Sequence, residues 1–197
     1  AANSEKVYTI VETDTVVSEN SKVFSRFVPE RTDDYAWEND KVAFRTYGPT
    51  AQKMAEEGVK GGTLSSGMDC WLKKVDYPII DKWYDKHTTG KGSYHEDTGE
   101  GLDNFHVGSS RGCGGLGVFI DNELYTSKNF IYYETLANGP IRTKFILDYE
   151  NWNAGEQTIT EQKIISLDLG NNFMHITAKV EGTETITVGL TLHENDG

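Results

Sequence analysis

Cysteine and proline are scarce in this chain of 197 residues, which contains two of the former and four of the latter. The two thiols, Cys70 and Cys113, are too few to enclose a metal ion by themselves. A single pair of cysteines also says little about the redox compartment. We expect both thiols to be free, and one disulfide between them is the alternative.

Long apolar runs and an excess of positive charge are also missing. No stretch approaches the roughly 18 consecutive apolar residues of a transmembrane helix, so we expect no membrane span. The 19 lysines and arginines are outnumbered by 31 acidic residues, and a net charge of −12 opposes binding to nucleic acid. Residues 1–6 do not have the apolar core of a signal peptide, and a signal removed ahead of residue 1 is compatible with export.

What the chain does contain is alternation of apolar or β-branched residues with polar residues, the pattern of half-buried β-strands. Turn-forming residues separate many of these segments. We therefore expect an all-β fold of consecutive antiparallel hairpins. The predicted strands are residues 7–17, 22–28, 42–47, 117–120, 124–126, 131–136, 141–149, 158–169, 173–180 and 185–193.

Helical signal is short and lies in the first half of the chain. Residues 49–57 can form a helix that ends at Gly58, and residues 70–84 have mixed periodicity interrupted by Pro78. Residues 86–117 have little periodicity, which predicts a long irregular segment. Such long loops are usually functional or disordered, and the aromatic and histidine content of this one favours function.

We find no linker, fixed repeat or low-complexity tract, so we expect residues 1–197 to form a single domain. The predicted strand 185–193 runs nearly to the last residue, although each strand of a hairpin series needs a partner. We therefore expect a further strand to follow in the natural protein, and this domain to be the N-terminal half of a larger β-sandwich.

Residues 94–106 concentrate groups that transfer protons or bind cations. The segment contains two imidazoles, His95 and His106, four carboxylates that include Glu100 and Asp103, and the phenol of Tyr94. Carboxylates suit hard cations and imidazoles suit transition metals, so a divalent cation is a possible cofactor. The spacing matches no known metal motif, and a solvated acidic loop is the alternative.

An arginine follows within a glycine-rich turn, residues 107–115. The planar guanidinium of Arg111 can hold a carboxylate through two parallel hydrogen bonds, and an acidic sugar is one fitting ligand. His106 could then give or take a proton, because an unperturbed histidine has a pKa of about 6.5. Alternatively, Arg111 pairs with a structural aspartate and His106 is a hydrogen-bonded loop residue.

Residues 27–45 combine aromatic rings with acids and arginines. Aromatic faces cover the apolar side of a pyranose while charged groups bond its hydroxyls, which is the chemistry of carbohydrate recognition. Arg31, Asp34, Trp37 and Arg45 are therefore candidate substrate-binding residues, although a core position is the alternative for the aromatic ring. His193, at the end of the last predicted strand, is a weaker candidate.

These segments also resemble a family. The chain is similar to bacterial domains of unknown function encoded among polysaccharide-degradation genes, especially those for pectin and other uronate-containing glycans. The resemblance implies a galactose-mutarotase-like β-supersandwich about twice the length of this chain. It extends over residues 23–194 and is carried by residues 27–45, 67–71, 99–103, 107–115 and 138–142.

We therefore expect an exported carbohydrate-active enzyme, periplasmic or extracellular, acting on uronate-containing oligosaccharides. In a lyase, Arg111 would neutralise the sugar carboxylate while His106 or Tyr94 removes the neighbouring proton. In a glycoside hydrolase, two carboxyls among Glu100, Asp103 and Asp34 would share the acid and base roles. Substrate would be oriented by Arg31, Asp34, Trp37, Arg45, His95 and His193.

Two other classes of function are alternatives, and the first of them uses the same aromatics and arginine without proton transfer. One is a non-catalytic glycan-binding β-sandwich domain. The other is a structural half-domain whose site exists only after a second chain or segment completes the sandwich.

Overall fold

The computed structural model describes Val7, Thr9, residues 21–108 and residues 111–191, and it contains three antiparallel sheets. In the first sheet, five strands are hydrogen-bonded in chain order. Its strands are β1 (Phe24–Val28), β2 (Asp34–Glu38), β3 (Val42–Thr46), β4 (Met68–Lys73) and β5 (Gly101–Phe105). The 3-10 turn η1 (Pro29–Arg31) precedes β2, and two helices, α1 (Pro49–Glu56) and α2 (Ile80–Thr88), follow β3 and β4.

The second sheet is built around the longest strand, β11 (Gln157–Asp168). One path runs from β8 (Phe130–Asn138) through β9 (Arg142–Tyr149) to β11, which also pairs with β10 (Trp152–Ala154) and β12 (His175–Glu181). A third, small sheet contains β6 (Leu116–Ile120), β7 (Glu123–Thr126) and β13 (Thr187–Val188). Asp121 and Asn122 join β6 to β7 with positive φ angles of 50° and 67°, the backbone of a two-residue hairpin turn.

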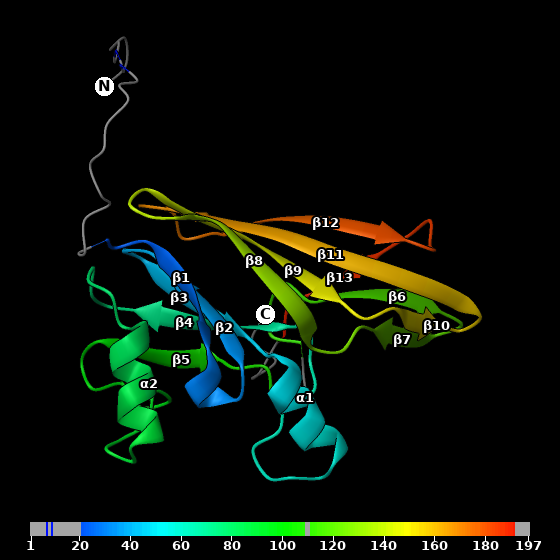
Figure 1. Cartoon of the computed structure of the whole chain (residues 1–197), viewed down its shortest axis with the longest axis horizontal. Helices are drawn as coiled ribbons and strands as arrows, with labels where there is room; N and C mark the ends of the chain where they lie inside the picture. Colours follow the sequence, from blue (N-terminus) through cyan, green and yellow to red (C-terminus); the bar gives the residue numbers. More distant parts are fainter. Residues whose placement is uncertain (1–6, 8, 10–20, 109–110, 192–197) are drawn as a thin grey trace.

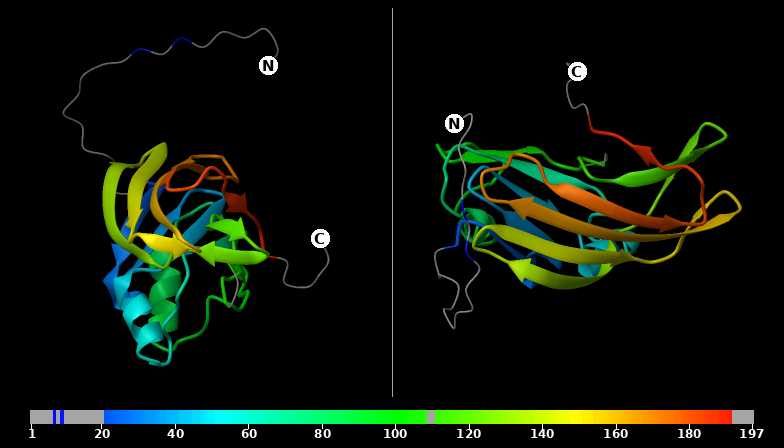
Figure 2. Two further views of the ribbon diagram at one scale, coloured as in Figure 1. Left: turned by 90° about the vertical axis from the view of Figure 1, so that its right-hand side faces the viewer. Right: turned by 90° about the horizontal axis from the view of Figure 1, so that it is seen from above.

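The first two sheets stack as a sandwich. Figure 1 shows the second sheet across one face of the first, with the two helices on the other side, and the views at right angles agree (Figure 2). Tyr35 and Trp37 of β2 pack in the main core between these sheets with Phe145 of β9. The other buried members of this core are Val42, Phe44, Met68, Phe130, Leu147, Tyr149, Ile165 and Leu167.

The first sheet is covered on both faces, which is why all residues of β2 and β3 are buried. Because side chains alternate along a strand, Asp34, Ala36 and Glu38 of β2 lie on the face opposite Tyr35 and Trp37. On that outer face a second core contains Ala36, Ala43 and Trp71 of the sheet with Ile80, Trp83 and Tyr84 of α2.

A buried carboxylate holds helix α2 against this outer face. Glu38 accepts hydrogen bonds from the backbone amides of Ile79 and Ile80 at the start of the helix, at 2.9 Å each. It also forms a fully buried ion pair with Lys73 of β4, at 2.6 Å. The carboxylate therefore satisfies amides that the first turn of a helix leaves unpaired.

The expected all-β, antiparallel sandwich with a few short helices is confirmed, and α1 lies close to the predicted helix. Four strands were not predicted: β2, β4, β5 and β10, of which β5 lies inside the segment expected to be irregular. Residues 70–84 divide into the end of β4 and the start of α2. The predicted strand 185–193 is reduced to β13 within the described residues, and strand 7–17 falls, apart from Val7 and Thr9, outside them.

Two further expectations concern the thiols and the membrane. Cys70 and Cys113 are both free thiols, as expected. Across the described ranges, no helix has the length and apolar character that crossing a membrane requires.

Candidate functional site

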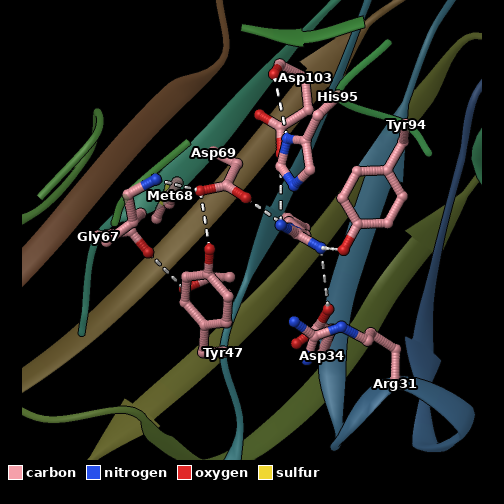
Figure 3. Close-up of polar contacts among 12 residues, drawn as sticks. Arg31, Asp34, Tyr47, Gly67, Met68, Asp69, Tyr94, His95 and Asp103 are labelled. Carbon is pink, nitrogen blue, oxygen red and sulfur yellow. Dashed lines mark hydrogen bonds and ion pairs between the residues drawn. The ribbon is translucent and has the colours of Figure 1, made fainter. Parts of the chain in front are cut away.

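The outer face of the first sheet carries a buried cluster of charges centred on Arg45 of β3. The Arg45 side chain is only 4 % exposed, and its guanidinium faces the carboxylates of three aspartates. Nε donates to Asp69 Oδ2 at 2.5 Å and Nη2 donates to Asp103 Oδ2 at 3.3 Å. Nη1 donates to the hydroxyl of Tyr94 at 2.7 Å and lies 3.8 Å from Asp34 Oδ2 (Figure 3). We call these five residues the Arg45 cluster.

Strand register explains why these groups meet. Arg45 pairs directly with Asp69 across β3 and β4, so the two side chains share a face. Trp71, two residues further along β4, lies on that face, pairs with Asp103 of β5, and has its ring 5.3 Å from the guanidinium carbon of Arg45. The antiparallel pairing of adjacent strands thus brings side chains from distant parts of the sequence together.

Burial changes the protonation of the cluster. Asp34 is fully buried, which raises its pKa to about 6, although the charges of Arg45 and Arg31 oppose the shift. Burial, together with the like charge of Asp69, raises the pKa of Asp103 to about 8. The cluster therefore contains a carboxyl group that is largely protonated at neutral pH, beside a guanidinium that is permanently charged.

Partly exposed basic groups surround this cluster, and we call them the histidine rim: Arg31, His87, His95 and His106. The His87 ring stacks on Tyr94 with centroids 4.0 Å apart, and His95 lies 4.7 Å from the same tyrosine and 5.6 Å from His106. The Arg31 side chain lies beside Asp34 (Figure 3). Burial and the charges of Arg31 and Arg45 lower the pKa of His87, and burial lowers that of His95.

The site thus unites seven of the eleven residues predicted from the sequence. They belong to the Arg45 cluster or to the histidine rim. They are Arg31, Asp34, Arg45, Tyr94, His95, Asp103 and His106. Within this set, His95, Asp103 and His106 form the one group in the described part of the chain whose side chains could together hold a metal ion.

Arg111 does not take the predicted place beside His106. Its guanidinium donates to Thr126 of β7 at 2.5 Å and to Ser65 at 3.4 Å, and it lines a small cavity beside β6, β7 and β13. The printed contacts of Arg111 therefore lie with Ser65 and the third sheet and not with the Arg45 cluster or the histidine rim. Arg111 thus lies beside the third sheet. The number of residues between His106 and Arg111 did not allow this position to be predicted.

Trp37 and Glu100 are also placed differently from the prediction. Trp37 has no exposed surface and packs against Phe145 in the main core, so its ring cannot lie against a sugar. Glu100 accepts hydrogen bonds from Lys82 at 2.6 Å and from the indole of Trp83 at 3.3 Å, and the bond from Lys82 lowers its pKa. His193, the remaining candidate, lies outside the described residues.

Three residues in or beside the site were not predicted from the sequence. Asp69 is a lone acid between apolar residues of β4, and Tyr47, which donates to Asp69 Oδ1 at 2.8 Å, follows β3. His87 lies in the last turn of α2, a segment whose mixed periodicity hid the helix. A polar residue within a buried strand was the available signal for Asp69, because such a group needs a partner.

The fold and site define a β-sandwich domain with a buried arginine–aspartate cluster beneath a rim of histidines. The chain belongs to the family described as "Domain of unknown function (DUF4861)", whose model matches residues 2–197. It is similar to "Uncharacterized protein P7" of Formosa agariphila, with 61 % identity over 197 residues. That alignment covers 99 % of this chain and 50 % of the relative, so the chain spans about half the length of the curated relative it matches. No solved structure matches it.

Proposed function

We propose that this domain acts on uronate-containing oligosaccharides by β-elimination, with the histidine rim as the place where the sugar binds. The observation that carries the proposal is the meeting of one guanidinium and three imidazoles on the partly exposed border of a buried acidic cluster. The proposal includes a periplasmic or extracellular location, and a galactose-mutarotase-like supersandwich such as pectin-associated domains have.

Arg31 is the residue that we assign to the uronate carboxylate. It is partly exposed at the end of η1, and one of its nitrogens donates to Thr32 Oγ1 at 2.7 Å. The guanidinium carries five N–H donors, so others remain for a ligand in the fork geometry that suits a carboxylate. Neutralising the carboxylate lowers the barrier to forming a carbanion beside it.

His87 is the residue that we assign to proton removal. Its lowered pKa keeps the imidazole neutral and able to accept a proton at neutral pH, and stacking on Tyr94 fixes the ring. Tyr94 is buried and its hydroxyl is engaged by Arg45, so it does not reach a sugar bound on the rim. In the reaction, His87 takes the proton beside the carboxylate, the C–H electrons form the C=C bond, and the C–O bond breaks. The leaving oxygen is protonated by the imidazolium or by water.

Hydrolysis has less support from the same geometry. Asp34 and Asp103 are buried, at 0 % and 2 % exposure, beside Arg45, where a glycosidic oxygen cannot reach them. Glu100 is held by Lys82 and Trp83. A pair of accessible carboxyls, which glycoside hydrolysis needs, is therefore not formed by the predicted residues.

The test is to incubate the full-length protein with saturated and unsaturated uronate oligosaccharides and to follow the ultraviolet absorbance of the conjugated alkene. We expect absorbance to rise with saturated substrates. The variants His87→Gln and Arg31→Lys should lower the rate at least about 100-fold and about tenfold, since proton transfer and carboxylate binding contribute on these scales. His175→Gln, an exposed histidine on β12, is the matched control.

Three results would contradict the proposal in different ways. Loss of absorbance from an unsaturated substrate would indicate hydrolysis. Binding without any change in absorbance would indicate a glycan-binding domain. A His87→Gln variant that eliminates as fast as the His175→Gln control would remove the assigned base.

A further inference from the structure

Three side chains around strand β5 bring possible metal ligands to one point. His95 precedes the strand, Asp103 lies within it, and His106 follows its last residue, Phe105. One ligand atom from each of the three lies within 4.8 Å of the other two, and His95 Nδ1 is 3.4 Å from Asp103 Oδ2. We propose that His95, Asp103 and His106 bind one divalent transition-metal ion, with Zn²⁺ as the best fit.

The backbone holds these residues in place. The amide of Asp103 donates to the carbonyl of Tyr94 at 2.8 Å, which fixes the segment containing His95 alongside β5. The amide of Val107, next to His106, donates to the buried carboxylate of Asp69 at 2.6 Å. Both histidines are thus attached through their neighbours to the first sheet, and a site on such a scaffold is preorganised.

A second observation comes from the buried carboxyl group. Asp103 is 2 % exposed, and its Oδ1 has no hydrogen-bond partner among the described residues. A buried carboxylate oxygen without a partner is costly, and structures rarely contain one without a missing water or ion. A metal ion held by both carboxylate oxygens of Asp103 would supply that partner, since Oδ2 is the oxygen that lies 3.4 Å from His95 Nδ1.

The ligand types decide which metal fits. Two imidazoles and one carboxylate are a ligand set for zinc and related first-row metals, whereas calcium and magnesium prefer oxygen ligands throughout. Ligand atoms about 2.1 Å from a tetrahedral ion lie about 3.4 Å apart. The His95–Asp103 distance already has this value, so small side-chain movements would close the site. Three protein ligands leave one position of a tetrahedral ion open.

The experiment measures metal binding directly. Full-length protein treated with a chelator is titrated with Zn²⁺ by calorimetry, and with Co²⁺ while its visible absorption is recorded. We expect saturable 1:1 binding for wild type and tetrahedral cobalt bands. His95→Ala and His106→Ala should each weaken binding more than about 100-fold, because even second-shell substitutions cost about 10–100-fold. His175→Ala on the second sheet is the control and should bind as wild type does.

The proposal is overturned if wild type shows no saturable binding, or if the His95→Ala and His106→Ala variants bind Zn²⁺ as tightly as the control. Circular dichroism checks that each variant is folded. If Asp103→Asn does not fold, the two exposed histidines still carry the test. Zinc binding without turnover of uronates would contradict only the proposed function, and turnover by protein that binds no metal would contradict only this inference.

Discussion

The Arg45 cluster allows one substitution to be worked out in detail. Arg45→Met keeps the length of the side chain and its packing against Trp71, but it removes the positive charge that faces Asp34, Asp69 and Asp103. Breaking a buried ion pair from one side costs about 3–5 kcal/mol, because the remaining charge is uncompensated. The hydroxyl of Tyr94 also loses its donor, which adds about 1 kcal/mol.

Urea denaturation measures this loss. With a slope of about 2 kcal/mol per M, a destabilisation of about 4–6 kcal/mol lowers the midpoint by about 2–3 M. Arg142→Met is the matched control, because Arg142 forms an exposed pair with Asp168, and pairs of that kind contribute little. Adding Asp69→Asn to Arg45→Met should recover part of the loss, since it removes one uncompensated carboxylate. Equal midpoints for Arg45→Met and Arg142→Met would refute the reasoning.

Three further predictions test other parts of the structure. The pKa of Asp34 is raised by burial from 3.8 to about 6, so ionisation of this group opposes folding. Its contribution to stability is present below about pH 4 and is lost as the pH rises to about 7, a change of about 3 kcal/mol. The free energy of unfolding of Asp34→Asn, measured by urea denaturation across this pH range, should lack this loss of about 3 kcal/mol. The same dependence on pH in the variant and in wild type would contradict the prediction. Arg111→Lys should leave the affinity for uronate oligosaccharides, measured by calorimetry, unchanged, because Arg111 donates its hydrogen bonds to Ser65 and Thr126. A large loss of affinity would show that Arg111 belongs to the binding site. Burial raises the pKa of Cys70 to about 12 and that of Cys113 to about 11, so iodoacetamide should label the folded protein slowly at pH 8 and the urea-unfolded protein rapidly. Equal labelling rates would contradict this burial.

Strands were predictable from the sequence where one face of a sheet meets the core and the other meets solvent. In β9 and β11 buried residues alternate with partly exposed ones, and β-branched or apolar residues fill most of the buried positions, with Glu161 and Lys163 of β11 as the charged exceptions. Strand β2 gave no such signal because both of its faces are buried. Asp34 of this strand was predicted to bind substrate, although α2 covers it and Tyr84 donates a hydrogen bond to its carboxylate.

The residue types of the site were predictable, but the direction of each side chain was not. Asp34 and Trp37 are three residues apart on one strand, so they point to opposite faces, and only Asp34 reaches Arg45. Which face becomes the core depends on the packing of two sheets and a helix. Arg111 shows a second limit, because a turn rich in glycine can direct the next side chain almost anywhere.

The attachment of α2 through Glu38 limits how a ligand can enter. Lifting the helix would strip two amides and an ammonium group of their only common acceptor and expose the rings of Trp83 and Tyr84 to water. The Arg45 cluster therefore meets solvent on the side of His95 and His106, whose side chains are exposed, and not on the side that α2 covers.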